Sequence, residues 1–194
     1  FDITDKITPI LTSPLRYLGA LKHAAKIIHA GGVTTVSDGA FGGVDFNKEY
    51  TAIKYSSWNR SSTPFRFNIL LDAKNMATNQ SHEQTFAQIE NLNANSKSEY
   101  NTDRITILPK QVKLFADGAA YSQLMQMSEG YTDGHHGEWL MTPEKLEQAV
   151  RIYWHAGYQI HLHVNGDLGL DATLDIVEKM QQELPRQDNR LTVH

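Results

Sequence analysis

Two histidines separated by one residue lie in an apolar segment, Ile160-His161-Leu162-His163-Val164. On a β-strand alternate side chains share a face, so both imidazoles would point one way and the aliphatic side chains the other. Neutral imidazole nitrogens bind divalent metals, and a His-x-His pair on a strand offers two of them. Two hydrogen-bonded core histidines would give the same pattern, so the spacing alone leaves both interpretations open.

A lysine lies inside a second apolar segment, Val112-Lys113-Leu114-Phe115-Ala116. Burying an unpaired ammonium costs several kcal/mol, so an interior lysine needs a partner or a chemical role. It could be neutral and catalytic, paired with an acid, or carbamylated, which converts the amine into a carboxylate able to bridge two cations. The alternative is a lysine at a strand end that extends to solvent.

Further polar candidates follow the expected strands. Asp38 and Asp117 each come just after such a strand, although Asp-Gly is also an ordinary turn. Asp167 closes the segment that begins at His163. His135 and its neighbour His136 lie in a glycine-containing loop, residues 119–141, which either borders an active site or is solvated.

Composition excludes several classes of protein. The 194 residues carry a formal charge of −4 with 21% charged residues and no basic run, which argues against a nucleic-acid-coating surface. No stretch approaches the ~18 apolar residues of a membrane span. The absence of cysteine excludes disulfides, thiolate metal sites and cysteine nucleophiles. No Walker-type phosphate loop and no Gly-x-Ser-x-Gly elbow occurs.

The sequence pattern predicts strands and helices that alternate along the chain. The expected strands are 33–36, 65–71, 111–116, 158–164 and 191–194. The expected helices are 17–30, a helix capped by Ser81 with a capping box to Gln84, a helix opened by Thr142-Pro143-Glu144, and 168–182. We expect the last helix to bury Leu170, Leu174 and Val177.

Strands separated by helices in this way form βα units and a parallel sheet. An open doubly wound sheet and a (β/α)8 barrel both fit, but a complete barrel needs about 250 residues. The chain begins at Phe1 and ends at His194 inside an apolar run, so we expect a single incomplete barrel spanning 1–194. In it Lys113, His163 and Asp38 should converge at the carboxyl-terminal rim, where barrel active sites lie.

Four segments together resemble the amidohydrolase superfamily, specifically its amidohydrolase-3 or YtcJ-like branch of metal-dependent hydrolases. In the family's order, these are Gly32-Val33-Thr34-Thr35-Val36 at its second barrel strand, Val112 to Gly118 at its fourth, Gly137 to Leu146 at a helix entry, and His163-Val164-Asn165-Gly166-Asp167 at its fifth. The likeness covers most of the chain and implies a partial (β/α)8 TIM barrel of about strands two to six.

The resemblance also implies one or two divalent metals, commonly zinc. Lys113 would be the carbamylated bridging ligand and His163 a ligand from the fifth strand. The sixth strand of the family ends in a Glu-His pair, and His194 aligns better with the glutamate; either His194 is the ligand or the ligand lies one residue beyond this chain. Two features of the family have no counterpart here. One is the His-x-His of its first strand. The other is the aspartate of its eighth strand, which is the expected general acid and base.

The implied reaction is hydrolysis of a non-peptide C–N bond in a small amide, formamide or cyclic amide, by water that the metal acidifies. The alternative is a non-catalytic barrel that serves as a binding or regulatory module. We expect the isolated chain to be inactive and to self-associate through its open strand edges. We expect a cytoplasmic location and neither nucleic-acid nor membrane partners.

Overall fold

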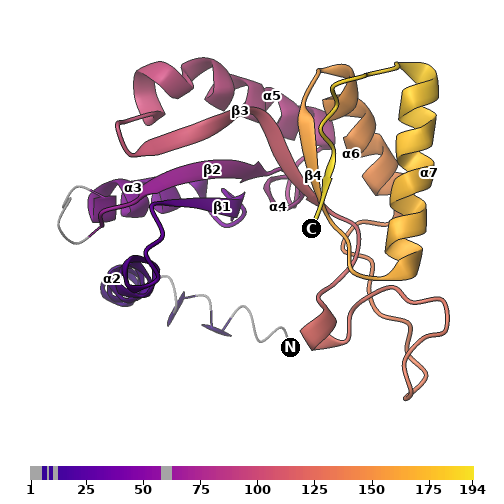
Figure 1. Cartoon of the computed structure of the whole chain (residues 1–194), viewed down its shortest axis with the longest axis horizontal. Coiled ribbons are helices and arrows are strands. Elements are labelled where there is room, and N and C mark those ends of the chain that lie inside the picture. Colours follow the sequence, from indigo (N-terminus) through magenta and orange to yellow (C-terminus); the bar gives the residue numbers. More distant parts are fainter. Residues whose placement is uncertain (1–5, 8, 11–12, 58–62) are drawn as a thin grey trace.

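The computed structural model describes residues 6–7, 9–10, 13–57 and 63–194, and its centre is one curled parallel sheet (Figure 1). The strands follow one another in sequence order: β1 (Thr35–Phe41), β2 (Arg66–Asp72), β3 (Ile105–Phe115), β4 (Gln159–His163) and β5 (Thr192–Val193). All four strand pairs are parallel. The expected parallel sheet of a partial barrel is therefore confirmed, with β1 and β5 at its two open edges.

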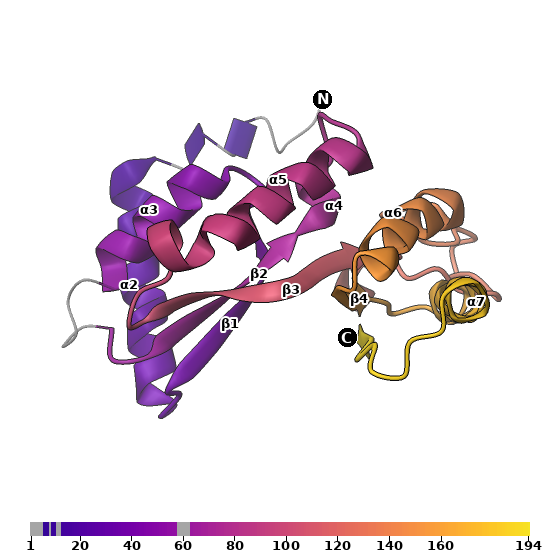
Figure 2. The same cartoon turned by 90° about the horizontal axis from the view of Figure 1, so that it is seen from above.

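Helices cover one face of this sheet. They are α3 (Phe46–Ser57), α4 (Ala73–Met76), α5 (His82–Asn95), α6 (Pro143–His155) and α7 (Asp167–Glu183), with a π-helical turn η1 (Ser96–Tyr100). Helix α2 (Pro14–Ala30) packs on α3, and a 3-10 turn, η2 (Ala120–Ser122), lies in the loop after β3. Figure 2 shows α3 and α5 along the same side of β1, β2 and β3, with α6 and α7 beside β4. None of the described helices is long and apolar enough to cross a membrane.

Local sequence signals explain where two of these helices begin. Ser81 caps α5 through a reciprocal capping box with Gln84, as expected. Thr142 is the N-cap residue of α6 and Pro143 its first residue, where a missing N–H costs nothing. Five side chains on one stripe of α6 are buried: Leu146, Ala149, Val150, Tyr153 and Trp154.

Alternation along the strands separates the core from the inner face. Val112 and Leu114 of β3 and Ile160 and Leu162 of β4 are at most 1% exposed and belong to the core under the helices. Lys113 is in register with His161, and Phe115 with His163, so these four side chains share the opposite face. The expected common orientation of Lys113 and His163 is therefore confirmed.

Three expectations about these elements are wrong in detail. The first strand runs from Thr35 to Phe41 and so includes Asp38. β3 begins six residues earlier than residue 111 and is interrupted by a bulge around Lys110, whose φ is 53°. On α7 the buried residues are Gly169, Thr173, Ile176 and Met180; of the three expected there, Leu170 and Leu174 are 40% and 53% exposed, and only Val177 packs, partly buried, against the core.

Candidate metal site

Lys113 lies at the centre of the inner face, near the carboxyl ends of the strands. Only 7% of it is exposed, and it is in register with Asp72 of β2 on one side and His161 of β4 on the other. Its Nζ lies 5.4 Å from the centre of the Phe115 ring. In the described part of the chain no hydrogen bond or ion pair to this Nζ is found, so the lysine is buried without the direct partner that burial normally requires.

Burial lowers the pKa of Lys113 to about 8, although the neighbouring Asp72 carboxylate opposes the shift. The pKa of Asp72 is itself raised, first by burial, against the hydrogen bonds from Asn75 that lower it. Near neutral pH an appreciable fraction of Lys113 is therefore the free amine, the form that can take up carbon dioxide as a carbamate.

The free-energy cost of burying the charged Lys113 side chain can be measured from the stability of the metal-free chain. From about pH 8 to 10.5 the unfolded chain holds the Lys113 proton more tightly than the folded chain, so the folded state gains stability as pH rises. Lys113→Met removes this cost. We expect the variant to be about 1–3 kcal/mol more stable than wild type at pH 7, with the difference fading toward pH 10.5.

The measurement is urea unfolding of both proteins from pH 6.5 to 10.5. Lys110→Met is the control, because Lys110 lies on the same strand but is exposed and paired with Glu90 at 2.9 Å. It should lower stability by less than about 1 kcal/mol. A Lys113→Met variant less stable than wild type across the whole range would contradict a buried, unpaired ammonium.

His161 is held by its neighbours at both ring nitrogens. Nε2 lies 3.0 Å from Oε1 of Gln111, and Nδ1 lies 3.1 Å from Nε2 of His194. Because the Gln111 oxygen only accepts, His161 donates from Nε2 and, as a neutral ring, accepts at Nδ1 from His194. Burial, then His194 and Lys113, lower the pKa of His161, in keeping with this neutral form. His161 thus has no lone pair left for a metal in this arrangement.

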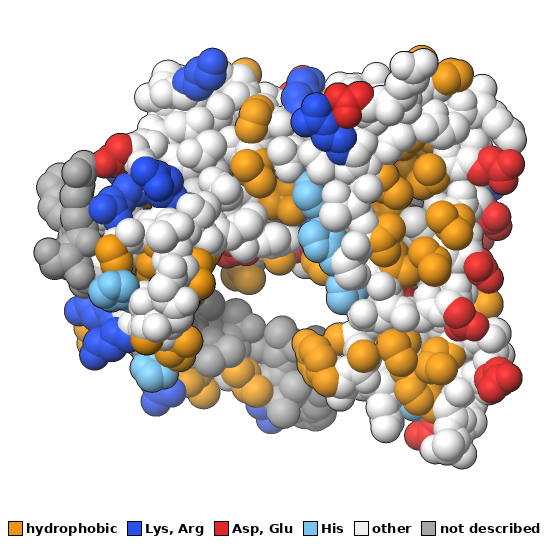
Figure 3. All heavy atoms as spheres, viewed as in Figure 1, with side chains coloured by type: hydrophobic (Ala, Val, Ile, Leu, Met, Phe, Trp, Pro, Cys, Tyr) orange, Lys and Arg blue, Asp and Glu red, His pale blue; other side chains and the backbone are white. Residues whose placement is uncertain are grey.

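Among the described residues, His194 keeps a free ring nitrogen, whereas His163 has to release its hydrogen bond from Asn165 before its lone pair can bind a metal. The Nδ2 group of Asn165 donates to Nε2 of His163 at 2.7 Å, while Nδ1 of His194 makes no hydrogen bond in the described part of the chain. Burial lowers the pKa of both histidines, and Lys113 lowers it further, so both rings are neutral near pH 7. Figure 3 shows histidine side chains in a column beside the hollow of this face.

Asp117 is a buried anchor rather than a rim ligand. Its side chain is fully buried and accepts backbone hydrogen bonds from Gln126 at 2.9 Å, Asn165 at 2.8 Å and Gly166 at 2.7 Å. The carboxylate therefore joins the end of β3 to loop 119–141 and to the start of α7. Because Asn165 in turn contacts His163, Asp117 positions that histidine.

Loop 119–141 is tied to the barrel along its length. Asp167 accepts hydrogen bonds from the backbone and hydroxyl groups of Ser128. A Cβ at Gly137 would lie 1.9 Å from the carbonyl oxygen of Met125, and one at Gly166 would lie 2.0 Å from that of Gln126. These glycines permit close packing of the loop, which lies beside the end of β4.

Other candidates lie away from Lys113. Asp38 is exposed and in register with Ile69, whose side chain packs under the helices, so the expected convergence of Asp38 with Lys113 and His163 does not occur. His135 is engaged within its loop: its ring contacts the Gln123 carbonyl, which contributes most to raising its pKa, and the Asp133 carboxylate, which raises it further.

Asp72 is a residue that the sequence reasoning missed. It is fully buried at the end of β2, in register with Lys113, and Asn75 donates to both of its carboxylate oxygens, at 2.9 and 2.6 Å. The sequence contains a pattern that points to it: Asp72 directly follows the apolar segment 69–71, just as Asp117 directly follows Ala116. Acids directly after two neighbouring parallel strands meet at the same edge of the sheet.

The inner face holds part of a metal-ligand set. Within the described ranges, no group of three or more histidine or acidic side chains is placed to hold a metal ion. Two neutral imidazoles, His163 and His194, nevertheless share the face with Lys113, an amine whose pKa is about 8. These donors suit a divalent cation, provided that further ligands complete the set.

Comparison with known proteins identifies the family of the chain. A family model described as "Amidohydrolase family" matches residues 3–194. The chain belongs to the amidohydrolase family. No curated protein matches it.

Two solved structures share the fold of this amidohydrolase chain. One is an uncharacterized metal-dependent hydrolase from Pyrococcus horikoshii OT3, with 20% sequence identity and a TM-score of 0.60; the match covers 90% of this chain and 33% of that one. The other is an uncharacterized metal-dependent hydrolase from Pyrococcus furiosus, with 19% identity and a TM-score of 0.59, covering 93% and 36%. The chain thus spans about a third of the length of these hydrolases.

Proposed function

We propose that this chain is the central barrel segment of a longer metal-dependent amidohydrolase that hydrolyses a non-peptide C–N bond in a small amide, formamide or cyclic amide. The observation that carries the proposal is the buried Lys113, without a direct partner, on the same face as His163 and His194. The family match over residues 3–194 supports it. A binding module that kept the barrel would not need a buried amine of lowered pKa at this position.

In this proposal Lys113, as its carbamate, and His163 hold a divalent metal, zinc being our expectation, and His194 is a further ligand candidate. A metal bound there would act as a Lewis acid on a carbonyl group and would acidify a water molecule. The residues of this chain supply neutral imidazoles, a basic amine and a fixed scaffold. The general acid and base lies outside this chain.

The experiment is a hydrolysis assay of the full-length protein and of this chain side by side. Each is supplied with zinc or manganese and bicarbonate, and tested on N-acyl amino acids, N-formyl amines and hydantoins. We expect turnover of at least one class by the full-length protein and none by this chain, because too few ligands and no fixed general acid are present.

Each other outcome is informative. Comparable turnover by the isolated chain would show that the site is misplaced and that His135, His136 or His161 performs chemistry. A full-length protein that binds metal but cleaves none of the three classes would favour the binding or regulatory module.

Self-association of the isolated chain is a second expectation. β1 and β5 are open edges of the sheet, and Val193 of β5 is 43% exposed on the face where the other strands are covered by helices. Open edges with apolar side chains recruit other strands. We expect dimers or larger species by sedimentation velocity at about tens of micromolar, a concentration at which such surfaces associate.

The matched variant is Val193→Lys, which places a charge on that edge and should shift the distribution toward monomer. Lys179→Ala, an exposed change on α7 away from the edge, should leave it unchanged. A wild-type chain that sediments as a stable monomer would contradict the expectation.

A further inference from the structure

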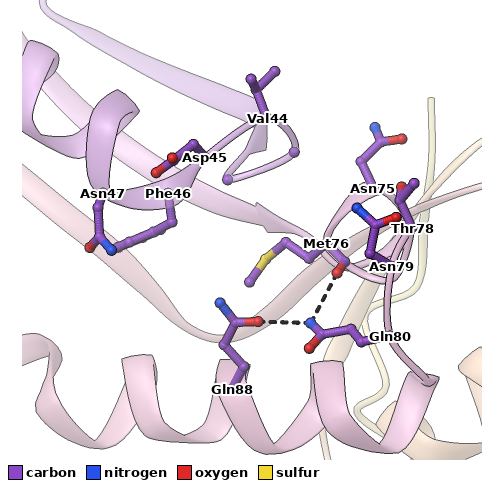
Figure 4. Close-up of a pocket in the computed structure, with 12 residues that line it drawn as sticks. Val44, Asp45, Phe46, Asn47, Asn75, Met76, Thr78, Asn79, Gln80 and Gln88 are labelled. Atoms are coloured by element: carbon purple, nitrogen blue, oxygen red, sulfur yellow. Dashed lines mark hydrogen bonds between the residues drawn. The ribbon is translucent and has the colours of Figure 1, made fainter.

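A polar pocket lies on the outer side of the barrel rim, away from Lys113. It has a volume of about 390 Å³ and is formed by the loop after β1, the segment after α4 and the side of α5 (Figure 4). The residues that line it are Gly42, Gly43, Val44, Asp45, Phe46, Asn47, Asn75, Met76, Thr78, Asn79, Gln80 and Gln88. A pocket of this size suits a small organic molecule.

Amide side chains dominate the walls. Five lining residues are asparagine or glutamine, and hydrogen bonds position three of them. Asn75 donates to Asp72, and Gln80 donates to the Met76 carbonyl at 3.0 Å and to Oε1 of Gln88 at 2.8 Å (Figure 4). The side chains of Asn47, Asn79 and Thr78, and the Nε2 group of Gln88, form no hydrogen bond in the described part of the chain. The pocket thus presents donors and acceptors together, above the side chains of Phe46 and Met76.

The loop on the other side of the pocket is also fixed. The Glu49 carboxylate accepts backbone hydrogen bonds from Gly42 at 2.8 Å, Val44 at 3.0 Å and Asp45 at 2.9 Å. Gly42 has a φ of 85°, which only glycine adopts readily, so this turn depends on that residue. A wall held in this way does not have to be ordered when a ligand binds, which favours affinity.

The pocket offers no free charge to balance an ionic ligand. Among the described residues, no lysine or arginine lines it, and its one acid, Asp45, is paired with Lys48 at 3.0 Å. Amide groups both donate and accept, as hydroxyl groups do, and the apolar floor suits C–H surfaces. We propose that this pocket, between the loop after β1 and α5, binds a small uncharged polyhydroxyl molecule of the monosaccharide class.

The pocket is connected to the inner face through one wall. Asn75 lines the pocket and donates to Asp72, the buried neighbour of Lys113 in the sheet. Gly43 lies against the same carboxylate, since a Cβ there would be 3.0 Å from Oδ2 of Asp72. The pocket is nevertheless distinct from the proposed metal site, because none of Lys113, His163 and His194 lines it.

Side-chain amide NMR signals test the proposal directly, since the asparagine and glutamine NH₂ groups of the pocket report on occupancy. The probe is D-glucose, titrated into the ¹⁵N-labelled chain. We expect saturable shifts of the Asn79 and Gln88 NH₂ signals with a dissociation constant on the order of millimolar, as for a ligand of about a dozen heavy atoms. Glucuronate and cyclohexanol, which add a charge or remove most hydroxyls, should bind more weakly.

Two amide residues of α5 provide a matched pair of variants. Gln88→Ala should weaken glucose binding about 3–10-fold, the equivalent of one lost hydrogen bond. Asn91→Ala, an exposed change on the same helix but outside the pocket, should leave glucose binding unchanged. Neither change touches Lys113 or its neighbours, so failure here leaves the hydrolase proposal standing. Three results would overturn the proposal. The first is that the shifts are absent or unsaturated at about 100 mM glucose, far above the expected dissociation constant. The others are that glucuronate binds more tightly than glucose, or that both variants have equal effects.

Discussion

Replacing Lys113 by alanine is expected to lower the turnover of the full-length protein by about 10³-fold or more. A metal that polarises the scissile group contributes several kcal/mol to transition-state stabilisation, and each 1.4 kcal/mol is a factor of about ten in rate. Lys113 is the one buried amine on the inner face of the described sheet, and the neighbouring carboxylate, Asp72, already accepts hydrogen bonds from Asn75 at both oxygens. Metal content per protein, measured by mass spectrometry of the element, should fall together with turnover.

A chemical rescue separates a ligand role from a packing role. Lys113→Ala leaves a space lined by Asp72, His161 and Phe115, and a short carboxylate such as propionate can fill it with the group that a carbamate would present. We expect propionate to restore part of the metal content and turnover, and propylamine without bicarbonate to restore neither. Full metal loading and activity in the unrescued variant would show that Lys113 is not a ligand.

Replacing Asp117 by alanine is expected to lower the free energy of unfolding of this chain by about 3–5 kcal/mol. The change leaves the backbone N–H groups of Gln126, Asn165 and Gly166 without their acceptor, and the bonds from Gln126 and Gly166 are buried. Each unsatisfied buried group costs about 1–3 kcal/mol, with part recovered by local rearrangement. Asp117→Asn keeps the shape but retains only one carboxamide oxygen as acceptor, so it should cost less than the alanine variant.

Urea unfolding followed by circular dichroism measures this effect. Asp133→Ala is the control: Asp133 is an exposed acid of loop 119–141 whose partner is His135 of the same loop, and its loss should cost less than about 1 kcal/mol. Equal unfolding midpoints for Asp117→Ala and wild type would show that loop 119–141 is not held through this carboxylate.

The sequence by itself determined the parallel sheet and the face to which its polar residues belong. Polar and aliphatic side chains alternate along Val112 to Phe115 and along Ile160 to His163. When helices cover one side of the sheet, only one assignment of these side chains to its two faces is possible. A shift by one residue would bury the lysine and the histidines under the helices. The capping box at Ser81 and the Thr142-Pro143 start are equally local, since their hydrogen bonds and dihedral preferences involve residues within one turn.

The buried face of α7 was decided by tertiary packing. The residues Leu170, Leu174 and Val177 form a stripe as regular as that of Gly169, Thr173 and Ile176, so the period alone does not choose between them. In the structure Gly169 faces inward against the Asp117 carboxylate, where a Cβ would be 3.0 Å from its carbon, and Leu170 and Leu174 consequently face outward. A hydrophobic pattern carries no information about so close a contact.

The roles of the acids were likewise decided in three dimensions. Asp38, Asp72 and Asp117 all stand near the ends of apolar segments, yet one is exposed on the helix side, one lies beside Lys113 and one binds three backbone N–H groups. The burial and the contacts of each carboxylate depend on where its strand ends and on which distant loop reaches it. Residue type and local spacing specify neither, because contacts between segments tens of residues apart form only when the sheet curls and loop 119–141 closes over the ends of β3 and β4.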